Sequence, residues 1–261
     1  MIIDAHSHIG FSDPLKGSVD NLLASMEKAG IEKAMVFAGK IGHCTTNDLL
    51  ESVRGYTDIL YPIGSFSALD LLPDVEFIEQ LLREKKIFGL KFYTGYEYFY
   101  PTDEKLYPYF ELLSIYNRPA IFHMGDTYKK VVTAKLKYAH PLAIDEVAVE
   151  FPKMKIIIAH VGYPWIIETA EVCAKNDNVY TDTSGFVYGP FTPIDREVFT
   201  KIIDYFKQHA PIASCLLFGT DWPISNQQSY VQTMSDLLPG DIQQQIFSEN
   251  SIRAFGLNQQ A

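Results

Sequence analysis

Short apolar runs alternate along the chain with stretches in which hydrophobic residues recur at helical spacing. The runs Ile156-Ile157-Ile158-Ala159 and Leu216-Leu217-Phe218 are typical of parallel strands, which are buried on both faces. We therefore predict strands at residues 2–8, 33–38, 61–66, 88–93, 120–123, 155–160, 179–183 and 215–219. We predict helices near residues 19–29, 47–56, 75–85, 104–116, 142–150, 166–174, 196–207 and 230–237, with one more at 242–255.

Eight strand–helix pairs predict a TIM barrel, the (β/α)₈ fold of the α/β class, with an additional C-terminal helix. Strands that alternate with helices favour βαβ units and a parallel sheet. The length of 261 residues fits one such domain over residues 1–261, because this barrel is built from roughly 250 residues. An open doubly wound sheet is the alternative, but no G-x-G-x-x-G turn follows the first predicted strand.

The composition narrows the classes of partner. The net charge is −10 and we find no dense cluster of Lys or Arg, which disfavours a nucleic-acid partner. No apolar run approaches the roughly 18 residues of a membrane span, so we expect a cytoplasmic protein with no membrane partner. Three widely separated cysteines argue against a disulfide framework and against a cysteine-rich zinc site. A small-molecule substrate is the expected partner, and the aromatic content leaves a homo-oligomer open.

Reactive side chains stand where the predicted strands end. In a (β/α)₈ barrel the C-terminal ends of the strands meet at one rim, where the active site lies. The strand ends DAHSH, LKFY, FHMG, AHVG and GTDWP would therefore bring their polar residues together. These residues are His6, His8, Lys91, His123, His160 and Asp221.

The pair His6 and His8 suits a metal ion, because residues two apart on a strand point to the same side. Imidazole is a ligand of borderline metals such as Zn²⁺, and a carboxylate such as Asp221 can complete the site while leaving room for water. A His-x-His pair alone is more typical of two solvated histidines. Four histidines and an aspartate at strand ends together indicate a metal site.

These segments resemble one enzyme superfamily. The pieces DAHSH, GLKFY, IFHMG, IIIAHVGYPW, LFGTDWP and ENSIRAFGL resemble the amidohydrolase superfamily, in its amidohydrolase-related (type 2) branch. The resemblance implies that His6, His8, His123 and Asp221 are metal ligands, and that Asp221 is also the general base toward the water that the metal activates. It gives His160 either a second metal or a direct role in polarising substrate and moving protons.

Lys91 has three interpretations. In binuclear members of the superfamily a lysine at the end of strand four is carboxylated and bridges two metals, and the order Lys91, His123, His160 is compatible with that arrangement. Lys91 could instead bind a substrate carboxylate, or be screened from the site. The loop after the second strand carries His43, which we interpret as solvated.

Other residues at the predicted rim have weaker assignments. Tyr93 and Tyr96 belong to an aromatic segment that would contact an apolar or aromatic substrate, or face a partner. Trp222 would shape the loop after the eighth strand and contact substrate. We expect Asp4 to share the face of the histidine pair and to orient a ligand. We expect Asp182 to line the pocket or to cap the next helix.

The leading hypothesis is a metal-dependent hydrolase that acts on a small ester, lactone or amide, with one or two divalent ions, Zn²⁺ by default and Mn²⁺ or Fe²⁺ as alternatives. The second is a lyase of the same superfamily, a non-oxidative decarboxylase or hydratase. A non-catalytic binding module, and a metal-free hydrolase with Cys44 or Ser7 as nucleophile, are less consistent with the filled ligand positions. Substrate identity resides in the loops and is not specified by the fold.

Overall fold

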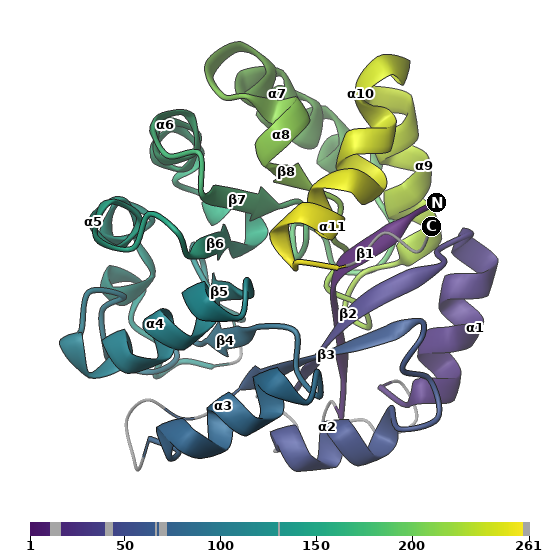
Figure 1. The fold of residues 1–261 in the computed structure, drawn as a ribbon. Coiled ribbons are helices and arrows are strands. Elements are labelled where there is room, and N and C mark those ends of the chain that lie inside the picture. The colour runs from purple at the N-terminus through teal and green to yellow at the C-terminus, as the bar shows by residue number, and fades with distance from the viewer. Residues whose placement is uncertain (11–16, 40–43, 66, 68–71, 130, 258–261) are drawn as a thin grey trace.

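Eight parallel strands form one sheet in which each strand pairs with the next along the chain (Figure 1). The computed structural model describes residues 1–10, 17–39, 44–65, 67, 72–129 and 131–257. The strands are β1 (Ile3–Ile9), β2 (Lys33–Ala38), β3 (Leu60–Ser65), β4 (Leu90–Phe92), β5 (Pro119–Phe122), β6 (Lys155–Ile158), β7 (Val179–Asp182) and β8 (Leu216–Leu217). The predicted (β/α)₈ barrel is confirmed.

Helices cover the outside of the sheet, one or more after each strand (Figure 1). They are α1 (Val19–Ala29), α2 (Thr46–Ser52), α3 (Val75–Arg83), α4 (Tyr107–Ile115), α5 (Leu142–Glu150), α6 (Ile166–Lys175), α7 (Pro193–His209), α8 (Ile212–Cys215), α9 (Gln227–Leu237), α10 (Gly240–Gln244) and α11 (Asn250–Ala254). None of the described helices is long and apolar enough to cross a membrane.

The ring closes between the first strand and the segment after the last. The amide of Ala5 donates to the carbonyl of Phe218 at 2.8 Å, and the amide of Asp221 donates to the carbonyl of His6 at 2.7 Å. The amide of His8 donates to the carbonyl of Trp222, also at 2.7 Å. At the closure of the ring, these bonds therefore fix the backbone of four candidate site residues: His6, His8, Asp221 and Trp222.

Alternate strand residues fill the inside of the barrel. Ile3, Phe37, Ile121 and Ile157 belong to one buried cluster there, whereas the residues between them pack outward against the helices. Phe255 at the end of α11 is fully buried in the same inner cluster. The additional C-terminal helix therefore closes the N-terminal end of the barrel, the end turned toward the viewer in Figure 1.

Most predicted elements are confirmed, with shifted ends. Strand β6 stops at Ile158, two residues early, because His160 and Val161 adopt left-handed backbone angles (φ 65° and 46°) in a 3₁₀ turn. The short helix α8 (Ile212–Cys215) occupies the start of the eighth predicted strand. The last predicted helix is interrupted by a π turn at Gln245–Glu249. Residue 66 at the end of the third predicted strand, and His43, lie outside the described residues.

Helix α7 begins three residues before its predicted start because a capping signal precedes it. The side chain of Thr192 accepts a hydrogen bond from the amide of Asp195, and the Asp195 carboxylate accepts one from the amide of Thr192. Pro193 occupies the first helical position, where its missing N–H costs no hydrogen bond. The sequence TPID therefore marked this helix start.

Candidate metal centre

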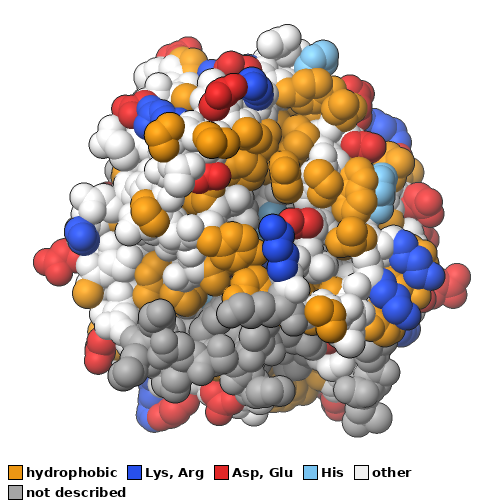
Figure 2. Space-filling model, turned by 180° about the vertical axis from the view of Figure 1, so that it is seen from behind, with side chains coloured by type: hydrophobic (Ala, Val, Ile, Leu, Met, Phe, Trp, Pro, Cys, Tyr) orange, Lys and Arg blue, Asp and Glu red, His pale blue; other side chains and the backbone are white. Residues whose placement is uncertain are grey.

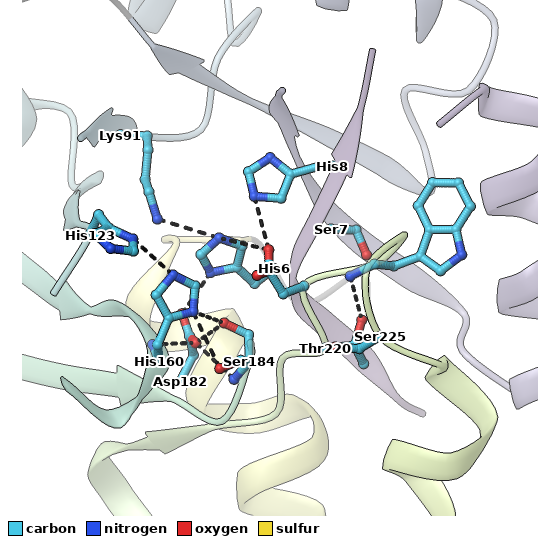
Figure 3. Close-up of polar contacts among 12 residues, drawn as sticks. His6, Ser7, His8, Lys91, His123, His160, Asp182, Ser184, Thr220 and Ser225 are labelled. Atoms are coloured by element: carbon cyan, nitrogen blue, oxygen red, sulfur yellow. Dashed lines mark hydrogen bonds and ion pairs between the residues drawn. The ribbon is translucent and has the colours of Figure 1, made fainter. Parts of the chain in front are cut away.

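Side chains from β1, β4 and β7 and from the segments directly after β5, β6 and β8 converge at the C-terminal ends of the strands (Figure 3). The convergence of His6 and His8 depends on an irregularity in β1: the pairing of β1 with β2 shifts register between Asp4 and Ser7. Ile3 and Ala5 point into the barrel, and after the shift the imidazoles of His6 and His8 do so too, both against Phe37. A bulge of this kind re-aims the side chains that follow it.

Three of the expected ligands lie within reach of one cation. One ligand atom each of His6, His8 and Asp221 can be chosen so that all three lie within 4.8 Å of one another. His8 Nε2 lies 3.1 Å from Asp221 Oδ1, and His6 Nε2 lies 3.9 Å from the same oxygen. Residues more than two hundred positions apart in the sequence thus meet as predicted.

Asp182, at the end of β7, holds His6. Its Oδ2 accepts a hydrogen bond from His6 Nδ1 at 2.9 Å, and both side chains are buried. Burial alone would raise the pKa of Asp182, but the His6 imidazole and its hydrogen bond bring the pKa below the usual range. An ionised carboxylate only accepts hydrogen bonds, so the His6 proton resides on Nδ1 and the lone pair of Nε2 points toward Asp221.

Ser184 orients His160 in a similar way. The Ser184 hydroxyl donates to Asp182, so its oxygen is left to accept a hydrogen bond from His160 Nδ1 at 2.8 Å. Asp182 also accepts from the amide of His160 at 3.0 Å. The lone pair of His160 therefore lies on Nε2, directed into the site.

His123 faces His160. Its Nε2 lies 2.9 Å from the carbonyl oxygen of Asp126, which can only accept, so His123 Nδ1 carries the lone pair. This Nδ1 lies 3.2 Å from His160 Nε2. The resemblance placed His123 beside His6, His8 and Asp221; the structure groups the other three and sets His123 against His160.

Two imidazole lone pairs that face each other at 3.2 Å repel unless a positive charge lies between or beside them. Burial lowers the pKa of His6 to about 3 and lowers the pKa of His160 and His123 as well, which keeps the imidazoles neutral. Neutral imidazoles with inward lone pairs, held by carboxylate, hydroxyl and carbonyl acceptors, are the donor set of a metal ion. The residues present therefore fit a divalent metal.

Lys91 lies inside the site and is not screened from it. Its neighbours Leu90 and Phe92 pack outward, so Lys91 takes the inward position of β4, and its Nζ is 3.4 Å from His6 Nε2. Burial lowers its pKa to about 8, although the carboxylates of Asp182 and Asp221 oppose this change. The third interpretation of Lys91 is wrong, and the two functional ones stay predictions.

Asp221 is ionised and constrained. Burial alone would raise its pKa, but the hydrogen bond from His8 and the surrounding imidazoles bring the pKa below its ordinary value. Its backbone has φ 64°, a strained value for a residue other than glycine, and such strain is common at functional sites. Gly185 packs against it so closely that a Cβ there would lie 3.0 Å from Asp221 Oδ2 and 2.7 Å from His160 Nδ1.

A pocket opens over these residues, and the space between its lining atoms, together with the part that is open to solvent, is about 640 Å³. Polar site residues form its floor, and aromatic residues form its walls. The lining residues are His8, Lys91, Tyr93, Tyr96, His123, Asp126, Tyr128, His160, Gly185, Tyr188, Asp221 and Ile224. Figure 2 views this end of the barrel, and hydrophobic side chains gather over its surface.

The two predicted aromatic contacts, Tyr93 and Tyr96, line the pocket, whereas Trp222 does not. The hydroxyl of Tyr93 donates to the carbonyl of Ala38 at 2.9 Å, and the hydroxyl of Tyr96 accepts from the amide of Tyr128 at 2.7 Å. The ring of Tyr96 lies 4.7 Å from that of His123. Trp222 packs in the outer core, where its backbone pairs with β1.

Asp4 does not orient an imidazole. Because of the register shift it leaves the face of the histidine pair, and its buried carboxylate instead accepts from the amides of His6 and Thr220, both at 3.0 Å. Its other oxygen accepts from Ser7 and Gln227 side chains. The Ser7 hydroxyl donates to Asp4 and not to a histidine. Burial raises the pKa of the Cys44 thiol. Neither residue is therefore an activated nucleophile.

From the sequence, Asp182 was expected only to line the pocket or to cap the next helix. Three other residues of the site were not identified: Ser184, Asp126 and Gly185. The signal for Asp182 was its position at the end of an apolar run, as for the other site residues. Ser184 and Gly185 follow it directly. Nothing in the sequence pattern indicated that the carbonyl of Asp126 would accept from His123.

Comparisons with known proteins address the family and the fold of the chain. A family model described as amidohydrolase matches residues 3–257. A search of curated proteins gives no match.

Solved structures with the same fold cover nearly the whole chain. An uncharacterized TIM-barrel protein from Bordetella bronchiseptica is 20% identical, with 98% of each chain covered and a TM-score of 0.77. A probable 2-pyrone-4,6-dicarboxylic acid hydrolase from Acinetobacter baumannii, with citric acid bound, is 14% identical over 98% of this chain and 99% of that chain, with a TM-score of 0.75. A dihydroxybenzoic acid decarboxylase from Polaromonas, with bound manganese and 2-nitroresorcinol, is 15% identical over 99% and 97%, also with a TM-score of 0.75.

Proposed function

The chain belongs to the amidohydrolase family of enzymes, and from this premise we propose that it is a metal-dependent hydrolase of a small ester, lactone or amide. The observation that carries the proposal is the group formed by His6, His8 and Asp221, whose ligand atoms lie within reach of one cation at the floor of the pocket. Zn²⁺ is the metal that this donor set favours, with Mn²⁺ and Fe²⁺ as alternatives.

His6, His8 and Asp221 would hold the ion, with His123 and His160 adjoining it. The ion supplies Lewis acidity toward a water molecule and toward a carbonyl oxygen of the substrate. Asp221 would take the proton from the attacking water and return it to the leaving group, because its carboxylate is ionised and lines the pocket. His160 Nε2, also on the pocket, would contact the substrate oxygen or bind a second ion. Asp182 and Ser184 keep the imidazoles in the required tautomers.

A decarboxylase is the second candidate, and Lys91 favours it. Among the described residues that line the pocket, Lys91 is the single Lys or Arg side chain, and it lies beside His6 where a substrate carboxylate would approach the ion. Aromatic walls suit an aromatic acid. Solved structures of the same fold include enzymes named for decarboxylation of dihydroxybenzoate and 5-carboxyvanillate, although at 14–15% identity this likeness shows the fold alone.

Metal analysis and a substrate panel test the proposal. We expect purified protein to contain at least one divalent ion per chain, and a chelator to abolish hydrolysis that Zn²⁺ or Mn²⁺ then restores. The panel should pair aryl esters, lactones and anilides with 2-hydroxybenzoates of similar size. Asp221→Asn is expected to abolish turnover, because the amide cannot accept the proton from water, whereas Asp204→Asn on the surface of α7 serves as the matched control.

Two results would contradict the hydrolase. One is turnover that survives complete metal removal. The other is release of CO₂ from hydroxybenzoates without turnover of any ester, lactone or amide, which would establish the second candidate. Ligand binding and metal content that are unchanged in a His6→Ala/His8→Ala double variant would support a non-catalytic binding module.

A further inference from the structure

One segment of the rim carries a concentration of positive charge that the family match leaves unexplained. The segment 127–138, which we name the lysine loop, joins β5 to α5 and contains Lys129, Lys130, Lys135 and Lys137. No Asp or Glu occurs from residue 127 to residue 144. The chain has a net charge of −10 and was expected to lack a dense cluster of Lys or Arg, yet these four lysines fall within nine residues.

The lysine loop is continuous with the pocket. Asp126 and Tyr128, at its start, line the pocket, and Lys129 follows directly. The described lysines, Lys129, Lys135 and Lys137, are all exposed. Residue 130 lies outside the described residues and enters the argument only through its sequence.

The loop after β4 holds the lysine loop in place. The amide of Lys135 donates to the carbonyl of Gly95 at 2.8 Å, and the ring of Tyr98 stacks on that of Tyr138 with centroids 5.8 Å apart. The ammonium of Lys135 lies 4.0 Å from the centroid of the Tyr98 ring, and that of Lys137 lies 4.7 Å from the Tyr138 ring. These contacts hold the two ammonium groups over aromatic rings at exposed positions.

The described lysines of the lysine loop are not engaged in ion pairs. Within the described part of the chain, no carboxylate forms an ion pair with Lys129, Lys135 or Lys137. The loops that follow β6, β7 and β8 contribute little charge: residues 161–167, 183–194 and 222–235 contain no Asp, Glu, Lys or Arg. Figure 2 shows basic side chains on the right of this face, the side of α4 and α5, with acidic side chains at its edge and hydrophobic side chains over the upper and central part.

Asp126 is the one carboxylate at the start of the loop. Burial raises its pKa, while the neighbouring charge of Lys129 acts in the opposite direction. One carboxylate against the three described ammonium groups leaves the lysine loop with a net positive charge, in a chain whose net charge is −10. Because the Debye length is about 8 Å at physiological salt, the charge of Lys129, which directly follows the pocket-lining Tyr128, acts on a ligand that enters the pocket.

We propose that the lysine loop attracts an anionic substrate, a small carboxylate, to the pocket and so selects it over its neutral counterpart. The inference rests on the proposed function and adds that the substrate of this site is anionic. This addition applies to the hydrolase and to the decarboxylase alike. Aromatic walls and a polar floor in the pocket suit a small ring with one or two acidic groups. The acidic character of the remaining chain disfavours a polyanion, which would contact more than the entrance.

Benzoate and benzamide form the test pair, because they match in shape and differ in charge. Their dissociation constants should be measured calorimetrically on metal-loaded full-length protein, at about 20 mM and about 500 mM NaCl. The test variant is Lys129→Gln/Lys135→Gln/Lys137→Gln. The matched control, Lys28→Gln/Lys85→Gln/Lys153→Gln, removes the same charge from exposed positions outside the rim.

We expect the wild type and the control to bind benzoate more tightly than benzamide at low salt. The loop variant should lose about tenfold in benzoate affinity at low salt and retain its benzamide affinity. High salt should remove most of the difference between the variant and the wild type.

The inference is overturned if the wild type shows no preference for benzoate, if the loop variant and the control behave alike, or if benzamide binding falls in parallel. Binding needs no turnover, so the charge preference can hold in a protein that hydrolyses none of the panel. Conversely, hydrolysis of neutral and anionic esters at equal kcat/KM, unchanged in the loop variant, would overturn the inference and leave the proposed hydrolase standing.

Discussion

Replacement of Asp182 by asparagine tests whether a buried carboxylate sets the tautomer of a metal-binding histidine. Asp182 accepts from His6 Nδ1 at 2.9 Å and from the amides of His160 and Ser184 at 3.0 Å each. In Asp182→Asn the amide oxygen can still accept from the two backbone amides. The amide nitrogen then faces His6 and donates to Nδ1.

This exchange moves the His6 proton. If Nδ1 accepts, Nε2 must carry the proton, and it no longer offers a lone pair toward Asp221 and the ion. The change also removes one negative charge beside the cation. Loss of such an orienting partner typically weakens metal affinity by about 10- to 100-fold, or about 1.4 to 2.7 kcal/mol.

Competition with a chromophoric chelator measures the Zn²⁺ affinity of the wild type and the variant. Asp145→Asn, which removes a surface carboxylate paired with Lys175 at 2.6 Å, is the matched control and should keep wild-type affinity. Two-dimensional ¹⁵N NMR of the imidazoles should report His6 protonated at Nδ1 in the wild type and at Nε2 in the variant, without reference to activity. A folded variant with wild-type metal affinity and an unchanged His6 tautomer would refute the reasoning.

Three further substitutions have defined outcomes. Gly185→Ala should lower kcat at least about tenfold, because the new Cβ would lie 2.7 Å from His160 Nδ1 and 3.0 Å from Asp221 Oδ2. The φ of 71° at this position also disfavours alanine. Steady-state kinetics with a panel substrate checks this prediction. Asp4→Asn replaces a buried carboxylate that accepts five hydrogen bonds, so at least one donor loses its acceptor and the free energy of unfolding in urea should fall by about 1–3 kcal/mol. Phe255→Ala empties the closed end of the barrel and should cost about 3–5 kcal/mol in the same urea experiment.

Each of these substitutions has a control in the chain. Gly55→Ala, where a Cβ meets no atom within 4 Å, should leave kcat unchanged. Asp20→Asn and Ile115→Ala change exposed residues, the latter 73% exposed, and should shift the unfolding free energy by less than about 0.5 kcal/mol. Equal effects in a variant and its control would contradict the packing or hydrogen-bonding argument behind that prediction.

The barrel could be predicted because its signal is repetitive. Each strand is a short apolar run, such as Ile156–Ile158, between two stretches in which hydrophobic residues recur at helical spacing. Eight repeats of this pattern favour a closed barrel over an open sheet. The meeting of His6 and Asp221 followed from the same logic, since strand ends share a rim. Element ends were less predictable, because the π turn at Gln245–Glu249 depends on packing that the hydrophobic pattern does not encode.

The finer arrangement of the site depends on contacts that strand periodicity does not contain. Strict alternation along β1 placed Asp4 with the histidines, but the register shift moved it to the outer side, where it joins β1 to the loop after β8. The hydrogen bonds of Ser184 and Asp126 to imidazoles require left-handed and turn geometry beyond the strand ends. His123 could be placed on the rim from its strand, but its orientation toward His160 could not.

The backbone bonds that join β1 to the segment after β8 bring the earliest and latest strands of the chain together. His6 and His8 leave the ribosome more than two hundred residues before Asp221. A growing chain therefore cannot offer all three ligands until Asp221 has been translated, so metal uptake would report closure of the ring. Once bound, the ion would resist separation of the two chain ends and stabilise the native state in proportion to its affinity.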